Sequence, residues 1–128
     1  NGTKELLDKL HEENYSLALA SSADRIKIDA NLKEAGFSPS LFKVIISGEE
    51  VSNKKPSPDI YNKTAEKMKA SPENCVVIED SINGVKSAKA AGMKCVALTT
   101  SFPEEKLKKA NPDFISNNIQ EVYTYLKQ

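Results

Sequence analysis

The chain has 128 residues, a length typical of one domain, and its 18 basic side chains balance 18 acidic ones. This balance argues against a protein that binds nucleic acid or an anionic membrane through bulk charge. A content of 39% hydrophobic and 28% charged residues is typical of a folded globular protein and excludes a mainly disordered chain.

Helices and short apolar strands alternate along the chain, without repeats or low-complexity segments. Apolar periodicity and capping signals predict helices over 3–13, 24–35, from 57 onward, 82–91, a short one after 103, and 119–127. Apolar runs predict strands over 16–20, 44–46, 75–78 and 96–98, with a further apolar pair at 114–115. Continuous apolar strands are typical of a sheet covered on both faces. We therefore predict one α/β domain over residues 1–128, a three-layer sandwich around a mainly parallel sheet.

The helix that begins near Ser57 carries a clear start signal. Ser57 offers a capping hydroxyl, and Pro58 is expected at the first helical position. The spacing of the next residues indicates an inner face, which consists of Ile60, Thr64, Ala65 and Met68.

Cysteine and histidine usage limits the possible chemistry. Cys75 and Cys95 each open an apolar run and are too few for a disulfide framework, which predicts buried free thiols in a reducing cytoplasm. The single histidine, His11, nearly excludes histidine-based triads and zinc clusters. No apolar run approaches the roughly 20 residues of a membrane span, so no membrane partner is expected.

Polar residues follow three of the predicted strands. Ser21 and Ser22 end the first, Lys55 lies in the loop after the second, and Glu79 and Asp80 end the third. Ligands of parallel α/β sheets bind beyond the carboxyl ends of the strands, so we expect these side chains to converge. Hydroxyls, a lysine and helix-start N–H groups bind phosphate, and adjacent carboxylates beside a phosphate require a cation, for which Mg²⁺ is favoured. The pattern predicts phosphoryl transfer.

Each of these signals also has a purely structural interpretation. Ser21 or Ser22 could cap the following helix, and Lys55 could be a solvated surface lysine. Glu79 and Asp80 could simply mark a helix start, where carboxylates interact favourably with the helix dipole. The order of all three along an α/β pattern is what favours the functional interpretation.

Four segments together resemble the haloacid dehalogenase superfamily, in its β-phosphoglucomutase and phosphoglycolate phosphatase-like branch. The segments are Leu-Ala-Leu-Ala-Ser-Ser at 17–22, Lys-Pro-Ser-Pro-Asp-Ile-Tyr at 55–61, Val-Ile-Glu-Asp-Ser-Ile-Asn-Gly-Val at 77–85 and Ala-Ala-Gly-Met at 90–93. The resemblance extends over essentially the whole chain from Gly2, and it implies a Rossmann-like core.

The resemblance implies a role for each polar residue. Ser21 would bind the transferring phosphoryl group, helped by the N–H of Ser22, and Lys55 would neutralise the phosphoryl oxygens and the nucleophile. Glu79 and Asp80 would hold Mg²⁺, with Asp80 the more direct ligand. The implied protein is a magnesium-dependent phosphatase, or a β-phosphoglucomutase-like enzyme, that acts on a small phosphorylated metabolite.

Two departures from the family pattern stand out. The family's nucleophile is the first aspartate of an Asp-x-Asp motif on a central strand, and no two aspartates of this chain have that spacing. We expect the nucleophile strand and the cap to lie upstream, so that this strand, or another chain, completes the sheet between Ser21 and Glu79. The chain alone is then expected to turn over no phosphoester.

The second departure concerns the residues after Ser22. Mutases of the family hold a second phosphate there, whereas Ala23, Asp24 and Arg25 offer it little, which favours a phosphatase. The alternative is a non-catalytic binding module, either receiver-like, flavodoxin-like or a degenerate member of the same superfamily. An Asp-x-Asp motif in the sequence upstream of Asn1 would favour the enzyme.

Overall fold

The computed structural model describes residues 2–128, so Asn1, the first residue of the predicted domain, lies outside the described residues. Helices and strands alternate in the predicted order. The helices are α1 (Thr3–Glu12), α2 (Arg25–Ala35), α3 (Asp59–Met68), α4 (Ile82–Ala90), α5 (Glu104–Leu107) and α6 (Ile119–Leu126). The strands are β1 (Ala18–Ala20), β2 (Val44–Ile46), β3 (Val76–Glu79), β4 (Lys94–Leu98) and β5 (Phe114–Ser116). Short 3₁₀ helices occupy Pro39–Leu41, Gly48–Glu50, Pro72–Asn74 and Lys108–Ala110.

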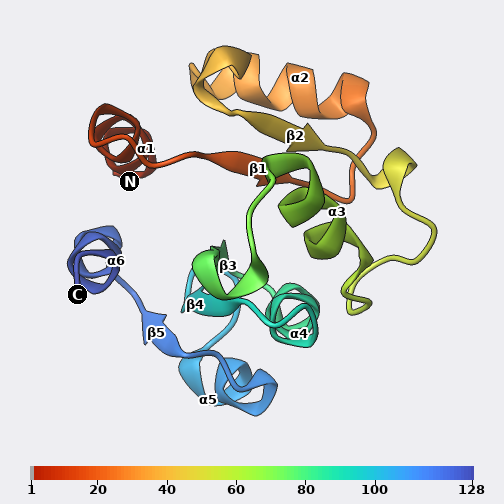
Figure 1. Cartoon of the computed structure of the whole chain (residues 1–128). Coiled ribbons are helices and arrows are strands. Elements are labelled where there is room, and N and C mark those ends of the chain that lie inside the picture. The colour runs from red at the N-terminus through yellow and green to blue at the C-terminus, as the bar shows by residue number, and fades with distance from the viewer. Residues whose placement is uncertain (1) are drawn as a thin grey trace.

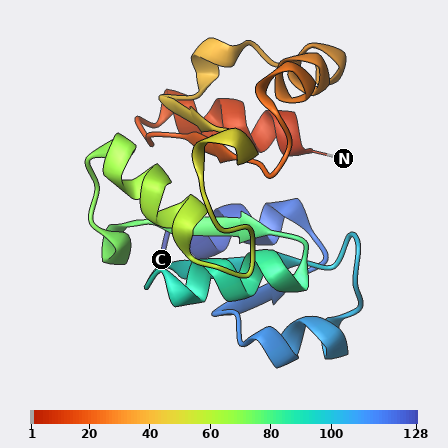
Figure 2. The same ribbon diagram turned by 90° about the vertical axis from the view of Figure 1, so that its right-hand side faces the viewer.

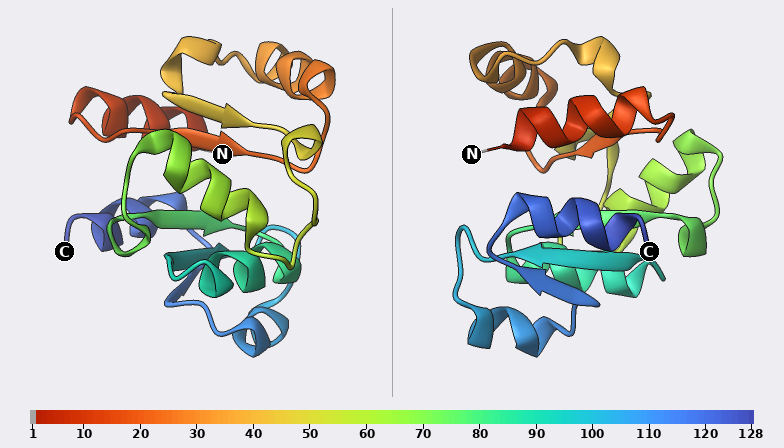
Figure 3. Two further views of the ribbon diagram at one scale, coloured as in Figure 1. Left: turned by 45° about the vertical axis from the view of Figure 1, so that its right-hand side comes forward. Right: turned by 90° about the vertical axis from the view of Figure 1, so that its left-hand side faces the viewer.

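The strands form two parallel sheets. β1 pairs with β2, and β4 pairs with both β3 and β5. β1, β2 and β3 point in the same direction (Figure 3, left), so their carboxyl ends lie at the same side of the molecule. The predicted α/β class and parallel pairing are confirmed. The division between the sheets falls between β1 and β3, where the family resemblance places a further strand.

Helices connect the two sheets across this division (Figures 1 and 2). On one face α1 and α6 lie side by side (Figure 3, right), and Leu6 and Leu10 of α1 pack in one cluster with Val96 and Val122. On the other face α3 contacts β1, β2 and α4. The layers of the predicted sandwich are therefore present on both sides of the division.

The larger core cluster lies between the second sheet and helices α3 to α5. Val85, Ala88, Cys95 and Leu107 are fully buried in it, and Ile46 joins it from β2. Both cysteines are free, as predicted, but only Cys95 is buried, whereas Cys75 is partly exposed at the start of β3. Burial raises the pKa of the Cys95 thiol to about 12, which makes it unreactive at neutral pH.

Local capping explains where the helices begin and end. The Asp24 carboxylate caps α2 by accepting from Lys27 N at 2.8 Å, and Gly36 ends this helix in the left-handed region with a φ of 83°. At α3 the start signal is shifted by one residue from the prediction. Pro58 occupies the cap position, and Asp59 N, which donates to Ser57 Oγ at 3.2 Å, belongs to the first helical residue.

The inner face of α3 also differs from the prediction. Ile60 and Ala65 are buried as expected, whereas Thr64 and Met68 are partly exposed. Tyr61 is buried in their place and has 7% of its surface exposed. The burial of a tyrosine beside the end of β3 brings a hydroxyl to the candidate site.

None of the helices formed by residues 2–128 combines the length and the apolar character that crossing a membrane requires. The predicted cytoplasmic location stays a prediction.

Candidate active site

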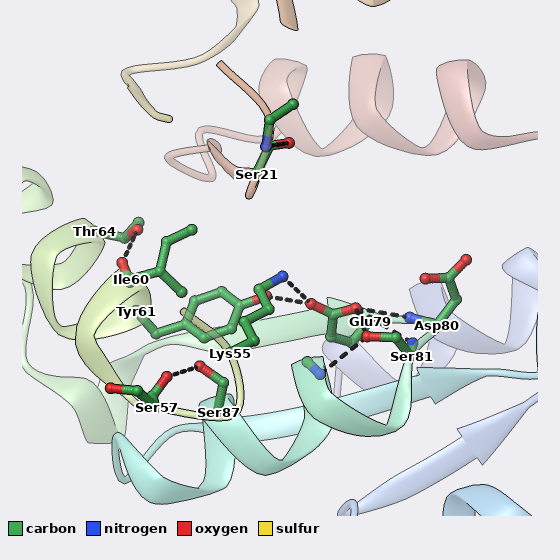
Figure 4. Close-up of polar contacts among 12 residues, drawn as sticks. Ser21, Lys55, Ser57, Ile60, Tyr61, Thr64, Glu79, Asp80, Ser81 and Ser87 are labelled. Carbon is green, nitrogen blue, oxygen red and sulfur yellow. Dashed lines mark hydrogen bonds and ion pairs between the residues drawn. The ribbon is translucent and has the colours of Figure 1, made fainter. Parts of the chain in front are cut away.

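An ion pair between Lys55 and Glu79 forms the centre of the site (Figure 4). Lys55 lies in the loop that leads into α3, and Glu79 is the last residue of β3. Lys55 Nζ lies 2.6 Å from Glu79 Oε2, and the two side chains are only 16% and 9% exposed. The sequence prediction that strand-end residues converge is thus met for this pair. Lys55 is not the solvated surface lysine of the structural alternative.

Both oxygens of Glu79 are occupied by donors. Oε2 accepts from Tyr61 Oη at 2.7 Å in addition to Lys55 Nζ. Oε1 accepts from Asp80 N at 3.1 Å, Ser81 N at 3.4 Å and Ser81 Oγ at 3.2 Å. The carboxylate therefore has one fixed position, in which it pairs with the lysine and accepts hydrogen bonds from the residues that begin α4.

The start of α4 is built to accommodate this carboxylate. Ser81 caps the helix by accepting from Gly84 N at 2.9 Å, while its own hydroxyl donates to Glu79. A Cβ atom on Gly84 would collide with the carboxyl group of Glu79. The Glu-Asp-Ser-x-x-Gly spacing thus places a helix cap, a glycine and a buried acid in direct contact.

Electrostatics keep Glu79 ionised. Burial alone raises the pKa of its carboxyl, but the Lys55 ammonium and the Tyr61 hydroxyl outweigh burial, and the pKa lies below its ordinary value. For Tyr61, burial and the adjacent Glu79 charge raise the pKa of the phenol. The phenol therefore remains protonated and is the donor in its contact with Glu79.

Asp80 faces a different part of the edge. Its side chain is exposed, and Oδ2 accepts from Thr100 Oγ1 at 3.3 Å and from Ser101 Oγ at 2.8 Å. Both hydroxyls belong to the loop that follows β4. The sequence analysis overlooked them, although the rule that functional groups follow strand ends, applied to the fourth predicted strand, would have found them.

The carboxylate oxygens at this edge of the sheet can be compared with the ligands that Mg²⁺ requires. Among residues 2–128 no group of three or more histidine, cysteine, aspartate or glutamate side chains is arranged to hold a metal ion. Within the same residues Asp80 Oδ1 accepts no hydrogen bond, so Asp80 can supply one oxygen ligand, whereas both oxygens of Glu79 are engaged. Mg²⁺ commonly takes one or two carboxylates and keeps several waters, so Asp80 fits as a single ligand.

Ser21 and Ser22 lie at the end of β1, in the other sheet. Ser21 N donates to Ile46 O at 3.0 Å, and Ser21 Oγ accepts from Ala23 N at 3.1 Å. Ser22 is exposed, and its carbonyl packs so closely on Gly48 that a Cβ atom there would collide with it. Neither serine caps α2, because Asp24 does so.

The structure therefore brings together only part of the predicted site. Lys55, Glu79 and Asp80 lie at adjacent positions of one edge, whereas Ser21 stands apart from them in Figure 4. Within the described part of the chain, no hydrogen bond or ion pair joins Ser21 to Lys55, Glu79 or Asp80. The roles of these residues in binding phosphate and metal stay predictions.

The residues after Ser22 are engaged locally. Arg25 N donates to Glu49 Oε1, and Arg25 Nε pairs with Asp29 Oδ1, both at 3.0 Å. Asp24 is the helix cap. Arg25 is therefore paired through Nε, and Ala23 and Asp24 carry no cation.

Comparison with known proteins identifies the relatives of this arrangement. The family model of the haloacid dehalogenase-like hydrolases matches residues 1–98. The chain is 44% identical to the protein SUPPRESSOR OF QUENCHING 1, chloroplastic, of Arabidopsis thaliana over 118 residues, which are 92% of this chain and 11% of that protein. It is 35% identical to the bifunctional riboflavin kinase/FMN phosphatase of the same plant over 121 residues, which are 94% of this chain and 32% of that protein.

A solved structure of a putative beta-phosphoglucomutase from Thermotoga maritima has the same fold, with a TM-score of 0.88 and 30% identity. The match covers 98% of this chain and 58% of that one. The chain thus spans between 11% and 58% of the length of these three proteins.

Proposed function

Because the chain belongs to the haloacid dehalogenase-like hydrolase family, we propose that it supplies the phosphate-binding and metal-binding edge of a phosphatase that acts on a small phosphorylated metabolite. A relative named for FMN phosphatase activity and a structural neighbour titled a putative beta-phosphoglucomutase support this class of reaction. Ala23 and Asp24 after Ser22 offer no cation to a second phosphate, which favours a phosphatase over a mutase that holds one. Family membership also disfavours the receiver-like and flavodoxin-like alternatives.

The ion pair of Lys55 with Glu79 is the observation that carries the proposal. An ammonium has three N–H donors, and within the described residues Lys55 uses one of them, toward Glu79. The other N–H groups are free to donate to phosphoryl oxygens at the sheet edge. Because the buried carboxylate already holds the ammonium in place, little reorganisation is needed when negative charge develops in the transition state.

Ser21 and Ser22 would bind the side of the phosphoryl group that faces away from Lys55. Ser21 Oγ accepts from Ala23 N, so its own hydrogen remains available to donate to a phosphoryl oxygen. The exposed Ser22 would add its main-chain N–H. Asp80 would hold Mg²⁺, which would neutralise charge on the transferring group, while Glu79 would position Lys55 rather than bind the metal directly.

The nucleophile would come from a strand outside this chain. The chain contains no Asp-x-Asp motif, and within residues 2–128 β1 and β3 each have a strand partner on one side only. A strand inserted between them would place a carboxylate between Ser21 and Lys55. An upstream segment of the same polypeptide or a second chain would supply it, and the aspartyl-phosphate intermediate would form there.

An activity assay tests the proposal. The longest natural polypeptide that contains this chain is expected to release phosphate from small phosphomonoesters, FMN and sugar phosphates included, only when Mg²⁺ is present. Lys55→Met should lower kcat/KM by about 100-fold or more, as expected for the loss of a preorganised donor to the transition state. Lys4→Met, which removes an exposed lysine of α1, is the matched control and should leave kcat/KM unchanged.

Three results would contradict parts of the proposal. Near-normal kcat/KM in Lys55→Met would remove the lysine from the site. Phosphate binding without hydrolysis by the longest polypeptide would indicate a degenerate, non-catalytic family member. Magnesium-dependent hydrolysis by the pure 128-residue chain, abolished by Asp80→Asn, would show that no outside nucleophile is needed.

A further inference from the structure

We propose that Tyr61 is a positioning residue of this site, whose hydroxyl fixes the Glu79 carboxylate and, through it, the Lys55 ammonium. The proposal rests on the proposed function, in which Lys55 binds the phosphoryl group. Tyr61 Oη donates to the same Oε2 atom that accepts from Lys55 Nζ, at 2.7 and 2.6 Å respectively. Figure 4 shows the two side chains meeting at that one oxygen of Glu79.

The aromatic ring of Tyr61 also limits where the lysine can go. Lys55 Nζ lies 5.2 Å from the ring centroid, within the range of a cation–π contact. The ring packs in the core cluster, to which Ile60 and Ala65 of α3 also belong. A lysine has a long, flexible side chain, so a fixed ring beneath it and a fixed acceptor ahead of it reduce its freedom.

Packing alone does not account for a tyrosine at this position. A phenylalanine would fill the same space in the core, and a buried phenol requires a hydrogen-bond acceptor. Here the acceptor is an ionised carboxylate, so the hydrogen bond is charge-assisted and stronger than a neutral one. Without the hydroxyl, Lys55 would be the only side chain holding Oε2, and water would take the vacated place.

The inference is tested by comparing two tyrosines that make the same kind of contact. Tyr61→Phe removes the hydroxyl at the site, and Tyr123→Phe removes the hydroxyl that donates to Glu13 Oε2 at 2.7 Å between α6 and the end of α1. Both variants are made in the polypeptide used for the activity assay, labelled with ¹⁵N-lysine. The NMR signal of the Lys55 ammonium is assigned by its loss in Lys55→Met. The affinity for inorganic phosphate is measured in parallel.

In Tyr61→Phe we expect the Lys55 ammonium signal to shift and broaden, and the Kd for inorganic phosphate to rise about threefold to tenfold, the effect of one lost hydrogen bond. Tyr123→Phe should leave both unchanged. A Lys55 signal in Tyr61→Phe that matches the wild type would overturn the proposal. If the wild type bound no phosphate, the proposed function would fail, while the Lys55 signal would still decide the role of Tyr61.

A measurement on the wild type covers the case in which Tyr61→Phe does not fold. The Tyr61 hydroxyl proton should be protected from exchange with water and should show magnetisation transfer to the side chain of Lys55. Rapid exchange of this proton with water would mean that the hydroxyl does not hold Glu79, and the proposal would be wrong.

Discussion

The two sheets of the molecule differ in how completely they are buried. In the second sheet Val77, Cys95, Val96 and Ala97 are all buried, whereas in the first sheet only Ile46 is. Yet strands of both sheets contain continuous apolar runs, such as Ala-Leu-Ala in β1 and Cys-Val-Ala-Leu in β4, a pattern typical of strands covered on both faces. The apolar character of β1 therefore exceeds the cover that the described residues give it, which agrees with the proposal of a further strand beside it.

The polar residues at the carboxyl ends of β1 and β3 also differ, because those of β3 make more contacts. At the end of β3, Glu79 is saturated by donors and holds Lys55 in place. At the end of β1, Ser21 contacts only nearby backbone, and Ser22 is exposed. The charged part of the site is thus preorganised, while the Ser21 hydroxyl accepts from Ala23 N but donates to no acceptor among the described residues.

The largest effect on stability is expected from the ion pair at the second sheet. Lys55→Met leaves the charge of Glu79 buried without its cation and should lower the free energy of unfolding by about 3 kcal/mol, near the lower end for such a loss because other donors remain. Lys4→Met breaks an exposed pair with Asp8 in α1 and should cost less than about 0.5 kcal/mol. Urea unfolding of both variants measures the difference, and equal losses would mean that the Lys55 pair is as solvated as the surface pair.

Equal truncations in the two sheets should have unequal costs. Val96→Ala in β4 removes methyl groups from a fully buried position and should cost about 2 kcal/mol, whereas Val44→Ala in β2 acts at a partly exposed one and should cost about 1 kcal/mol or less. Denaturant midpoints with unchanged slopes give both values. The reverse order would show that β2 is the better packed strand.

A smaller effect is expected from protonating Glu79. Its pKa in the folded chain lies below the ordinary value of about 4.3, so the stabilisation is complete above that value and is lost as pH falls through the depressed pKa. The loss should be smaller than in Lys55→Met, because a protonated carboxyl leaves no unpaired buried charge. The free energy of unfolding is measured between pH 7 and pH 3. The difference between Glu79→Gln and the wild type should shrink as pH falls, whereas the difference for Glu105→Gln, on the surface of α5, should not. A constant difference would contradict this assignment.

The smallest effect is expected where the two sheets are joined by polar contacts. Glu13 after α1 accepts from Tyr123 and Lys127 of the C-terminal segment, but these side chains lie near the surface. Tyr123→Phe should therefore leave the midpoint of thermal unfolding close to that of the wild type. A marked drop would mean that polar contacts, rather than the packing of Leu10 against Val122, hold the sheets together.

Sequence patterns predicted the fold class and the charged end of the site. The order of helices and strands follows from periodicity and caps, and the strand-end rule identified Lys55, Glu79 and Asp80. Tyr61 was not predicted, because a tyrosine in an apolar helix face carries no local sign of where its hydroxyl points. The engagement of Glu79 with five donors was also beyond prediction, since three of these come from its own neighbours in a tight strand-to-helix turn.

The close approach of Gly84 to Glu79 makes these two positions mutually dependent in evolution and in protein engineering. Any side chain at 84 displaces the acid at 79 and so releases the lysine, whereas a smaller residue at 79 removes the steric obstacle. Gly84→Ala alone should thus destabilise the fold, and it should destabilise the fold much less when it is combined with Glu79→Ala. A library that varies one position at a time would therefore miss the tolerated pairs of residues, and only paired variation would find them.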